Sequence, residues 1–193
     1  MRATAVRPGR TGRTVAALCL VVGAAACTDD PEKPPPDQHA DHVALELSIG
    51  PGASGLSTQG RDELQNGVGA ALSTYVVDAF LGDYPRDDFV DALDTFTSGL
   101  VNDGAEDLQL ITGAGFGNDV ESVTATRLSA TISSFAPKGQ VVGATAVVDF
   151  AFDVEVGGET REATRRGRLM LVPEDGGWKI FGYRLVSEPG GGL

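Results

Sequence analysis

Cysteine, histidine and tryptophan are scarce in this chain of 193 residues, which has two cysteines, two histidines and one tryptophan. So few cysteines exclude a disulfide-rich scaffold, and the absence of a three-residue glycine period excludes a collagen-like chain. Basic residues are also few: 15 lysines and arginines stand against 27 acidic residues, a net charge of −12. We therefore expect no nucleic-acid partner, because phosphates require clustered basic side chains. Only one apolar run approaches membrane length, which excludes a protein that crosses the membrane several times.

That run belongs to an N-terminal segment with the features of a secretory signal peptide. Residues 1–13 carry four arginines and no acid, and the apolar run covers residues 14–26. The ending Gly-Ala-Ala-Ala-Cys27 resembles a bacterial lipobox, in which the cysteine is lipidated and becomes the new N-terminus. We predict a lipoprotein signal peptide over residues 1–26, acylation of Cys27 that includes palmitate, and an anchor on the extracytoplasmic face of the cell membrane. The alternative is an ordinary signal peptide cleaved near Ala26, with an incidental cysteine after it.

Cleavage would change both the thiol content and the charge. Cys19 would leave with the signal peptide and Cys27 would carry the lipid, so the mature domain would have no free thiol in an oxidising compartment. Loss of four arginines leaves 11 basic residues against 27 acidic ones, a net charge of −16. The excess of arginine over lysine, 12 to 3, is typical of a GC-rich genome of the actinobacterial type.

Residues 27–42 are interpreted as the lipidated cysteine and a disordered, Pro-rich tether. After the cysteine, four prolines and six charged residues leave too little apolar surface for a core. Polyproline II geometry, at about 3.1 Å per residue, would extend the tether to roughly 45 Å. Both histidines, His39 and His42, lie here beside Asp37 and Asp41. These four could bind a transition metal weakly, but a tether lacks the fixed scaffold of a genuine site, so we predict no metal and no cofactor.

The folded domain is predicted over residues 43–188, followed by a Gly-rich tail at 189–193. Helical periodicity comes before strand periodicity along the chain, which indicates an α+β fold rather than alternating βαβ units. Apolar residues at helical spacing predict three helices, over residues 61–81, 85–96 and 102–111.

Alternating apolar and polar positions then predict an antiparallel sheet. The pattern is clearest at residues 141–156, where one face is apolar and the other becomes charged. A short apolar segment at residues 43–49 is a candidate for a further strand. Four strands are predicted in this C-terminal part, over residues 123–135, 141–156, 168–172 and 178–186.

The segment Gly167–Tyr183, GRLMLVPEDGGWKIFGY, resembles the closing hairpin of the NTF2-like superfamily, also called SnoaL-like or cystatin-like. The matching order of elements spans residues 60–187, and the hairpin is its distinctive part. The resemblance implies three N-terminal helices packed on a curved four-stranded antiparallel sheet that forms a cone. Within this superfamily, the chain most resembles secreted actinobacterial lipoproteins that contain such a domain. In this superfamily the cone serves as a pocket; some members are isomerases, dehydratases or cyclases, and many only bind or assemble.

Such a cone would be lined or filled by the aromatic residues of the helices and strands. Packing, which sequence spacing does not reveal, decides between an open hydrophobic pocket and a filled core. The predicted residues are Tyr75, Phe80, Phe89, Phe96, Phe150, Phe152 and Trp178.

Catalytic machinery is poorly represented in the domain. Enzymes resembling ketosteroid isomerase or scytalone dehydratase use an Asp base, His–Asp pairs and Tyr donors, yet this domain has no histidine beyond the one at its border. Serine and cysteine nucleophiles would therefore lack a base. Tyr75 and Tyr183 are candidate donors, but both lie in apolar patterns typical of core tyrosines. Asp149 and Asp153 alternate with phenylalanines and should face away from the helices, so we predict no catalytic residue.

Three further motifs have ordinary explanations. Asp87-Asp88-Phe-Val-Asp91 has the letters of a magnesium-diphosphate motif, but acids in the first turn of a helix stabilise its dipole by about 0.3–1 kcal/mol without a ligand. Gly113-Ala-Gly-Phe-Gly117 lacks the spacing of a dinucleotide loop. The one basic cluster of the domain is interpreted as a solvated strand edge rather than an anion site; its members are Arg161, Arg165, Arg166 and Arg168.

Three functions remain as hypotheses. The first is a non-enzymatic module that binds a hydrophobic small molecule or an extracytoplasmic protein. The second is a small isomerase- or cyclase-type enzyme that uses the cone as its active site. The third is an assembling module, such as a homodimer formed through the outer face of the sheet. A buried unpaired carboxylate would favour the enzyme, an open dry cavity would favour binding, and a filled core with an apolar outer patch would favour assembly.

Overall fold

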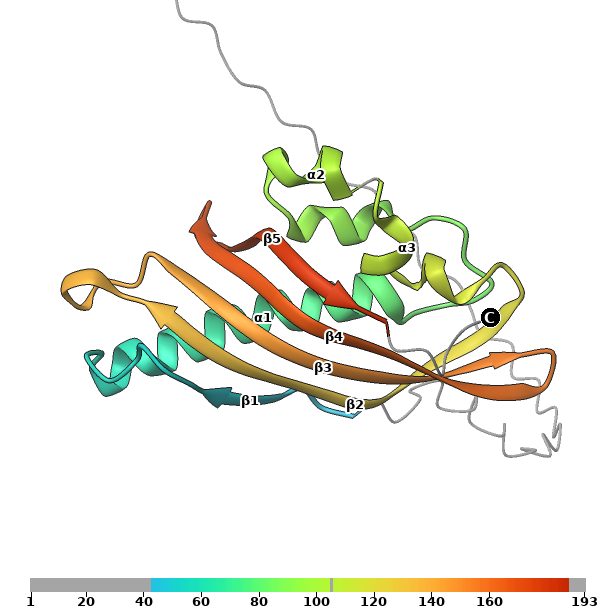
Figure 1. The fold of residues 1–193 in the computed structure, drawn as a ribbon, viewed down its shortest axis with the longest axis horizontal. Coiled ribbons are helices and arrows are strands. Elements are labelled where there is room, and N and C mark those ends of the chain that lie inside the picture. Colours follow the sequence, from blue (N-terminus) through green and yellow to red (C-terminus); the bar gives the residue numbers. More distant parts are fainter. Residues whose placement is uncertain (1–42, 105, 188–193) are drawn as a thin grey trace, which may run out of the picture. The chain divides into compact units, whose positions relative to one another are not determined.

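The computed structural model describes residues 43–104 and 106–187. These residues form an α+β fold in which one long helix and several short ones pack against a five-stranded, mostly antiparallel open sheet (Figure 1). The predicted signal peptide, Cys27, the tether and the tail at 189–193 lie outside the described residues. Within the described part of the chain, no helix is long and apolar enough to span a membrane.

Helix α1 (Thr58–Phe80) is the main helix of the fold and confirms the first predicted helix. It begins at Ser57, whose side chain accepts a hydrogen bond from the Gly60 amide at 3.1 Å. This is the usual way to satisfy an amide that has no partner in the first turn. One face of α1 is buried, as helical spacing predicts; it carries Leu64, Val68, Leu72, Tyr75, Val76, Ala79 and Phe80.

The other two predicted helices, over 85–96 and 102–111, are wrong in their extent. Between α1 and the next strand the described residues form only short helical turns, the longest being seven residues. They are η1 (Val90–Thr95), α2 (Ser98–Gly104), α3 (Leu108–Ile111) and η2 (Gly113–Phe116).

Side chain to backbone hydrogen bonds explain why no long helix begins at Pro85. Arg86 donates to the carbonyls of Asp78 at 2.6 Å and Leu81 at 3.1 Å, so it caps the C-terminal end of α1. The Asp88 carboxylate accepts from the Val90 amide at 2.9 Å. Bonds of this kind offer the backbone an alternative to helical hydrogen bonding. The segment therefore closes α1 instead of forming a second long helix.

The sheet has the strand order β1-β2-β3-β4-β5, with every neighbouring pair antiparallel except β1 and β2. The predicted sheet of four antiparallel strands is thus corrected to five strands, because the candidate strand at 43–49 pairs in parallel with the edge of β2. The strands are β1 (Glu46–Ile49), β2 (Val120–Phe135), β3 (Gly143–Val156), β4 (Glu159–Glu174) and β5 (Gly177–Val186).

Strand β4 is much longer than the predicted strand at 168–172. It begins directly after Gly157 and Gly158, which both have positive φ, at 61° and 76°. Two such residues form the tight turn that joins antiparallel strands, so Glu159 pairs with Val156 at once. The first half of β4 is mainly polar and pairs only with β3, which is why the apolar pattern did not reveal it.

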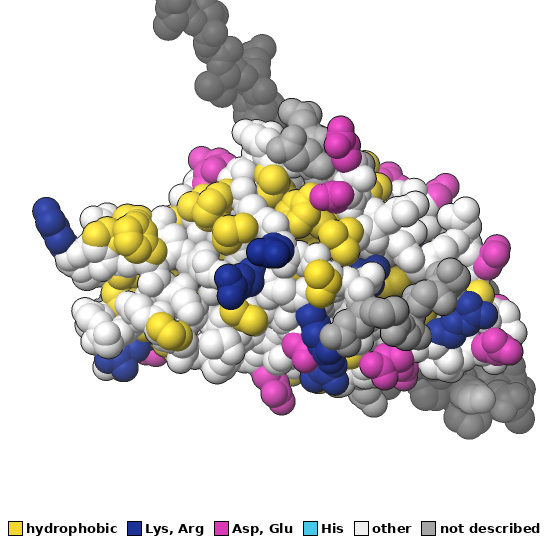
Figure 2. Space-filling model, viewed as in Figure 1, with side chains coloured by type: hydrophobic (Ala, Val, Ile, Leu, Met, Phe, Trp, Pro, Cys, Tyr) yellow, Lys and Arg dark blue, Asp and Glu magenta, His cyan; other side chains and the backbone are white. Residues whose placement is uncertain are grey.

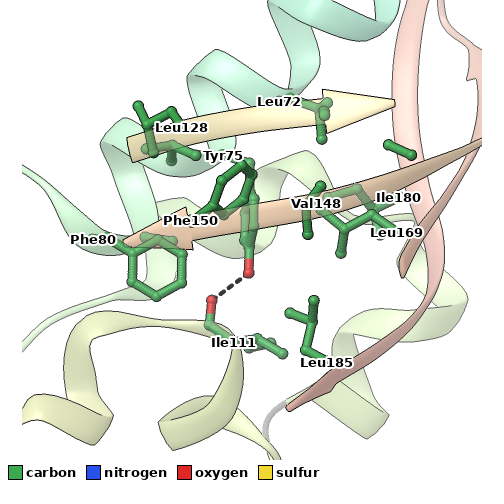
Figure 3. Close-up of a cluster of buried hydrophobic side chains, with 14 of the residues drawn as sticks. Leu72, Tyr75, Phe80, Ile111, Leu128, Val148, Phe150, Leu169, Ile180 and Leu185 are labelled. Carbon is green, nitrogen blue, oxygen red and sulfur yellow. Dashed lines mark hydrogen bonds between the residues drawn. The ribbon is translucent and has the colours of Figure 1, made fainter. Parts of the chain in front are cut away.

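The core lies between α1 and the inner face of the sheet. In Figure 3, Leu72 and Tyr75 of α1 lie against Val148 and Phe150 of β3 and Leu169 of β4. In Figure 1, α1 lies behind the sheet, so the outer face of the sheet is turned toward the viewer. Register shifts in the β2–β3 and β4–β5 pairs leave extra residues on β2 and β5; such bulges increase the bend and twist of a strand.

Candidate binding groove

The aromatic residues predicted to line or fill a cone fill the core. Six of the seven are at most 5% exposed, and only Trp178 is partly exposed. Tyr75 makes edge contacts with Phe80 and Phe96, with ring centroids 5.7 Å apart in both pairs, and Phe80 stacks on Phe152 at 4.9 Å. Edge and offset contacts of this kind are the favoured arrangements of packed rings. The inner side of the sheet is therefore occupied by the protein's own side chains.

The two candidate phenolic donors both have hydrogen-bond partners. Tyr75 is fully buried and donates to the Ile111 carbonyl at 2.6 Å (Figure 3). Burial raises the pKa of Tyr75 well above its ordinary value, an effect that Arg165 opposes. Tyr183 donates to the carboxylate of Asp107 at 2.8 Å, on the surface. In the described residues the buried polar side chains are three threonines and Arg165, so no buried carboxylate lies beside either phenol.

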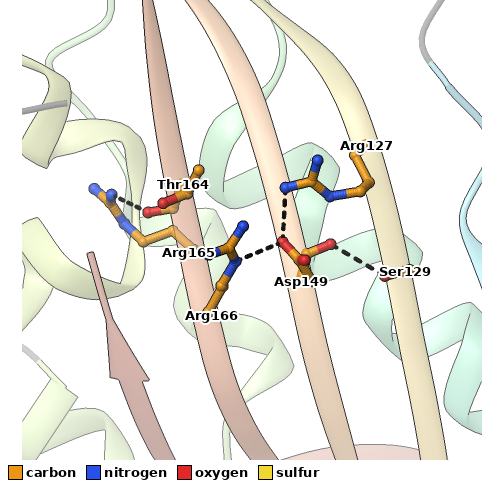
Figure 4. Close-up of polar contacts among 6 residues, drawn as sticks. All are labelled: Arg127, Ser129, Asp149, Thr164, Arg165 and Arg166. Atoms are coloured by element: carbon orange, nitrogen blue, oxygen red, sulfur yellow. Dashed lines mark hydrogen bonds and ion pairs between the residues drawn. The ribbon is translucent and has the colours of Figure 1, made fainter. Parts of the chain in front are cut away.

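Asp149 faces away from the helices, as the alternation predicts. Its carboxylate accepts hydrogen bonds from Arg127 and Arg166, each at 3.0 Å, across three strands of the outer face (Figure 4). Burial raises the pKa of Asp149, but the hydrogen bonds and charges of the two arginines outweigh it, so the pKa lies below its ordinary value. This carboxylate is an ion-pair partner in the sheet and has no access to the core.

The remaining motifs receive structural roles, with one correction. Asp88 binds the Val90 amide within a turn, and Thr112 accepts from the Ala114 amide at the start of η2. Three or more potential metal ligands gather nowhere in the described residues. The interpretation of the basic cluster as a solvated strand edge is wrong for Arg165, which is only 5% exposed. Sequence alternation places Arg165 on the inner face, where α3 and η2 cover it.

A hollow of about 870 Å³ lies between α1 and the hairpin that joins β4 to β5. Small side chains of α1, at Gly67, Ala70, Ala71 and Thr74, form one side of it. The hairpin residues 173–179 and the end of η1 form the other sides. Because these four α1 residues recur at helical spacing, they share one face and leave room that larger side chains would fill.

Trp178 is the central residue of this hollow, and Gly67 is the reason it fits. A Cβ atom at position 67 would lie 2.5 Å from the indole Nε1 of Trp178. Glycine inside a helix costs about 1 kcal/mol relative to alanine, so its place here is explained by the close approach of the indole.

A second hollow of about 430 Å³ continues the first along α1. It is bordered by Leu56, Gly60, Gln140 and other residues, and it shares Glu63 and Trp178 with the larger hollow. We call the two together the α1 groove. Trp178 thus stands in the middle of an extended groove, with space on both sides of the indole.

The α1 groove carries excess negative charge. Four carboxylates border it, at Glu63, Asp94, Glu174 and Asp175, against one cation, Lys179. The ammonium group of Lys179 donates to the backbone carbonyl of Asp94 and so closes one side of the groove. An aromatic face beside several carboxylates attracts positively charged groups, through both charge and the π system of the indole.

Sequence patterns identified only part of this site. Trp178 was among the predicted residues, whereas the acids and the small α1 residues were not. A stripe of glycine and alanine at helical spacing within α1 was the available signal, because such a stripe permits close approach of another element. Comparisons with family models, curated proteins and solved structures found no match to this chain. The fold and the groove therefore describe the protein as an α+β domain with a filled core and an acidic surface groove.

Proposed function

We propose that this protein is a lipid-anchored, extracytoplasmic, non-enzymatic binding module. Its α1 groove would hold an extended, positively charged segment of a partner protein. The observation that supports this most directly is the partly exposed Trp178 in the middle of a groove bordered by four carboxylates. A fold related to the NTF2-like cone, with its interior filled by aromatic residues, is part of the proposal.

An extended cationic segment fits the groove better than a hydrophobic small molecule does. The two hollows lie in line along α1 and share Trp178, so a ligand that uses both must be elongated. Sites for apolar ligands are enclosed and mainly apolar, whereas this groove has charged borders. Lysine or arginine side chains could meet the carboxylates while their aliphatic stems cover the indole.

Fluorescence of Trp178 tests the groove directly, because it is the single tryptophan of the chain. We expect a peptide of alternating lysine and alanine, added to the full chain in detergent, to change its emission saturably. Replacing two of the carboxylates that border the groove, in the double variant Glu63→Gln with Glu174→Gln, should weaken peptide binding about tenfold. Exposed ion pairs contribute about 0.5–1 kcal/mol each.

A matched control removes the same charge from the outer face of the sheet. Asp153→Asn with Glu162→Gln changes two carboxylates that are opposite each other in the β3–β4 pairing. This variant should bind the peptide like the parent chain. Equal weakening in both double variants, or no saturable change in the parent, would show that the groove is not the binding site.

A second candidate function, assembly through the outer face, is favoured by exposed apolar side chains there. Phe135 is 68% exposed and Phe181 is 46% exposed, and both border a hollow of about 270 Å³. Figure 2 shows this face, with hydrophobic side chains at the end where β2 and β3 are joined and others over β5 and the short helices. If this surface forms a homodimer, sedimentation should show a dimer that Phe181→Asp converts to a monomer. A monomeric parent chain would remove this candidate.

A further inference from the structure

A separate, smaller pocket of about 260 Å³ lies where β5 has ended. Val186, the last residue of β5, pairs with Arg166, so the earlier residues of β4 have no partner from β5. Residues of α3 and η2, among them Leu110 and Phe116, cover this stretch and border the pocket. Among the described residues at its border, Arg165 carries the single charge.

Arg165 is a buried cation that has no carboxylate partner among the described residues. Its Nε donates to the Leu110 carbonyl at 3.0 Å, one Nη to the Thr164 carbonyl at 2.9 Å, and the other to Gln109 at 3.4 Å. Its guanidinium also lies 5.0 Å from the centre of the Phe116 ring. A guanidinium has five N–H donors, so the three carbonyls leave two donors without an acceptor among the described residues.

The adjacent residue, Arg166, has the carboxylate partner that Arg165 lacks in the described part of the chain. Arg166 donates to the Asp149 carboxylate on the outer face, whereas Arg165 extends to the side of β4 toward α3 (Figure 4). Burying a charge costs free energy unless an opposite charge accompanies it. Burial lowers the pKa of Arg165 below its ordinary value, an effect partly opposed by Tyr75.

Thr164 alternates with Arg165 in β4, so its side chain leaves the strand on the opposite face and only its carbonyl meets the guanidinium. Gly115 also borders the pocket; a Cβ atom there would lie 2.1 Å from the Gln109 carbonyl oxygen and 3.0 Å from an Nη atom of Arg165. Buried polar atoms are nearly always hydrogen-bonded, and an exception calls for an explanation. A buried guanidinium with two N–H donors left over at a pocket is explained by a bound anion.

We propose that this pocket binds the carboxylate of a small monocarboxylic acid, with the two remaining N–H donors of Arg165 donating to its oxygens. A planar carboxylate matches the forked donors of a guanidinium. A monoanion is favoured over a phosphate because one cation is available to balance it. The pocket is smaller than the roughly 300–1,000 Å³ of typical ligand sites, and Phe116 and Ala163 border it, so a short apolar chain fits. This site is independent of the α1 groove.

Carboxyl-labelled ¹³C-butyrate, titrated into the full chain in detergent and followed by NMR, tests the proposal. We expect saturable binding to the parent chain, no binding of the uncharged butanamide, and loss of butyrate binding in Arg165→Met. Arg165→Lys keeps the buried positive charge and removes the forked pair of donors, so it is the milder variant of the same residue. It should weaken butyrate binding about tenfold, the effect of one hydrogen bond to a charged group.

Arg166→Met, which removes the same charge from the outer face, is the matched control and should bind butyrate like the parent. A second source of a carboxylate is the chain itself, because Glu188 follows the pocket residue Ser187 in the sequence. Binding in Glu188→Gln but not in the parent would identify that side chain as the occupant and overturn the proposal of a free acid. No binding in either, or equal affinity in Arg165→Lys and the parent, would overturn the proposed site.

Discussion

At the scale of single residues, Tyr75 both packs in the aromatic core and makes a buried hydrogen bond. It lies at the centre of the aromatic core, in contact with Phe80 and Phe96, and its hydroxyl reaches the Ile111 carbonyl at the end of α3. This hydrogen bond therefore joins α1 to a short helix 36 positions further along the chain. The carbonyl has no access to water, so the bond satisfies a group that would otherwise be costly to bury.

We predict that Tyr75→Phe lowers the free energy of unfolding by about 1.5 kcal/mol, the cost of leaving a buried acceptor without its donor. Urea denaturation followed by circular dichroism measures this. Tyr183→Phe is the control, because the Tyr183 hydroxyl bonds to an exposed carboxylate. Its cost should be below about 0.5 kcal/mol. Equal costs in the two variants would contradict the buried role of Tyr75.

The same tyrosine should contribute to alkaline instability. Burial raises the pKa of Tyr75, and it raises the pKa of Tyr84 to about 12, so the folded state keeps both phenols protonated at a pH where the unfolded chain does not. Their contribution is complete below about pH 10, the unfolded value; that of Tyr84 is lost as the pH rises to about 12, and that of Tyr75 continues to fall at higher pH. Tyr75→Phe should therefore lose stability less steeply than the parent chain above pH 10.

At the scale of elements, α1 depends on its first turn. Ser57 is the single side-chain cap at its N-terminus, and its hydroxyl accepts from the Gly60 amide. We predict that Ser57→Ala lowers the free energy of unfolding by about 1 kcal/mol, while Ser57→Asp retains the cap and most of the stability. Thermal unfolding of the two variants checks this. Equal stability of the alanine and aspartate variants would show that the cap contributes little.

Elements differed in how well local patterns predicted them. Helix α1 and strand β3 were predicted nearly to their ends, because each buries one face and the spacing of its apolar residues records that face. The turns between α1 and β2 were not, because Arg86 and Asp88 bind backbone groups there and override helical periodicity. The first half of β4 was missed because only β3 supports it and its residues remain polar.

At the scale of the whole molecule, the N-terminal segment would determine where the domain works. We predict that Cys27→Ser releases the protein from membranes, because a hydrophobic anchor attached to that cysteine would be absent. Fractionation of a lipoprotein-processing bacterial host, with mass spectrometry of the N-terminus, measures both the location and the lipid. Membrane association with a lipid mass in the variant would contradict the lipobox interpretation.

What the sequence by itself determined is local or compositional: the acidic charge, the α+β order and the main helix, while the lipobox stays a prediction from the same kind of local pattern. These follow from the spacing of residues along the chain and from their counts. Tertiary structure alone decided that six of the seven aromatic residues fill the core and that Arg165 is buried. It also decided that Trp178 rests on Gly67, 111 positions away, and so creates the α1 groove. The physical reason is that such contacts depend on how distant elements pack, and no local spacing rule records which side chains meet there.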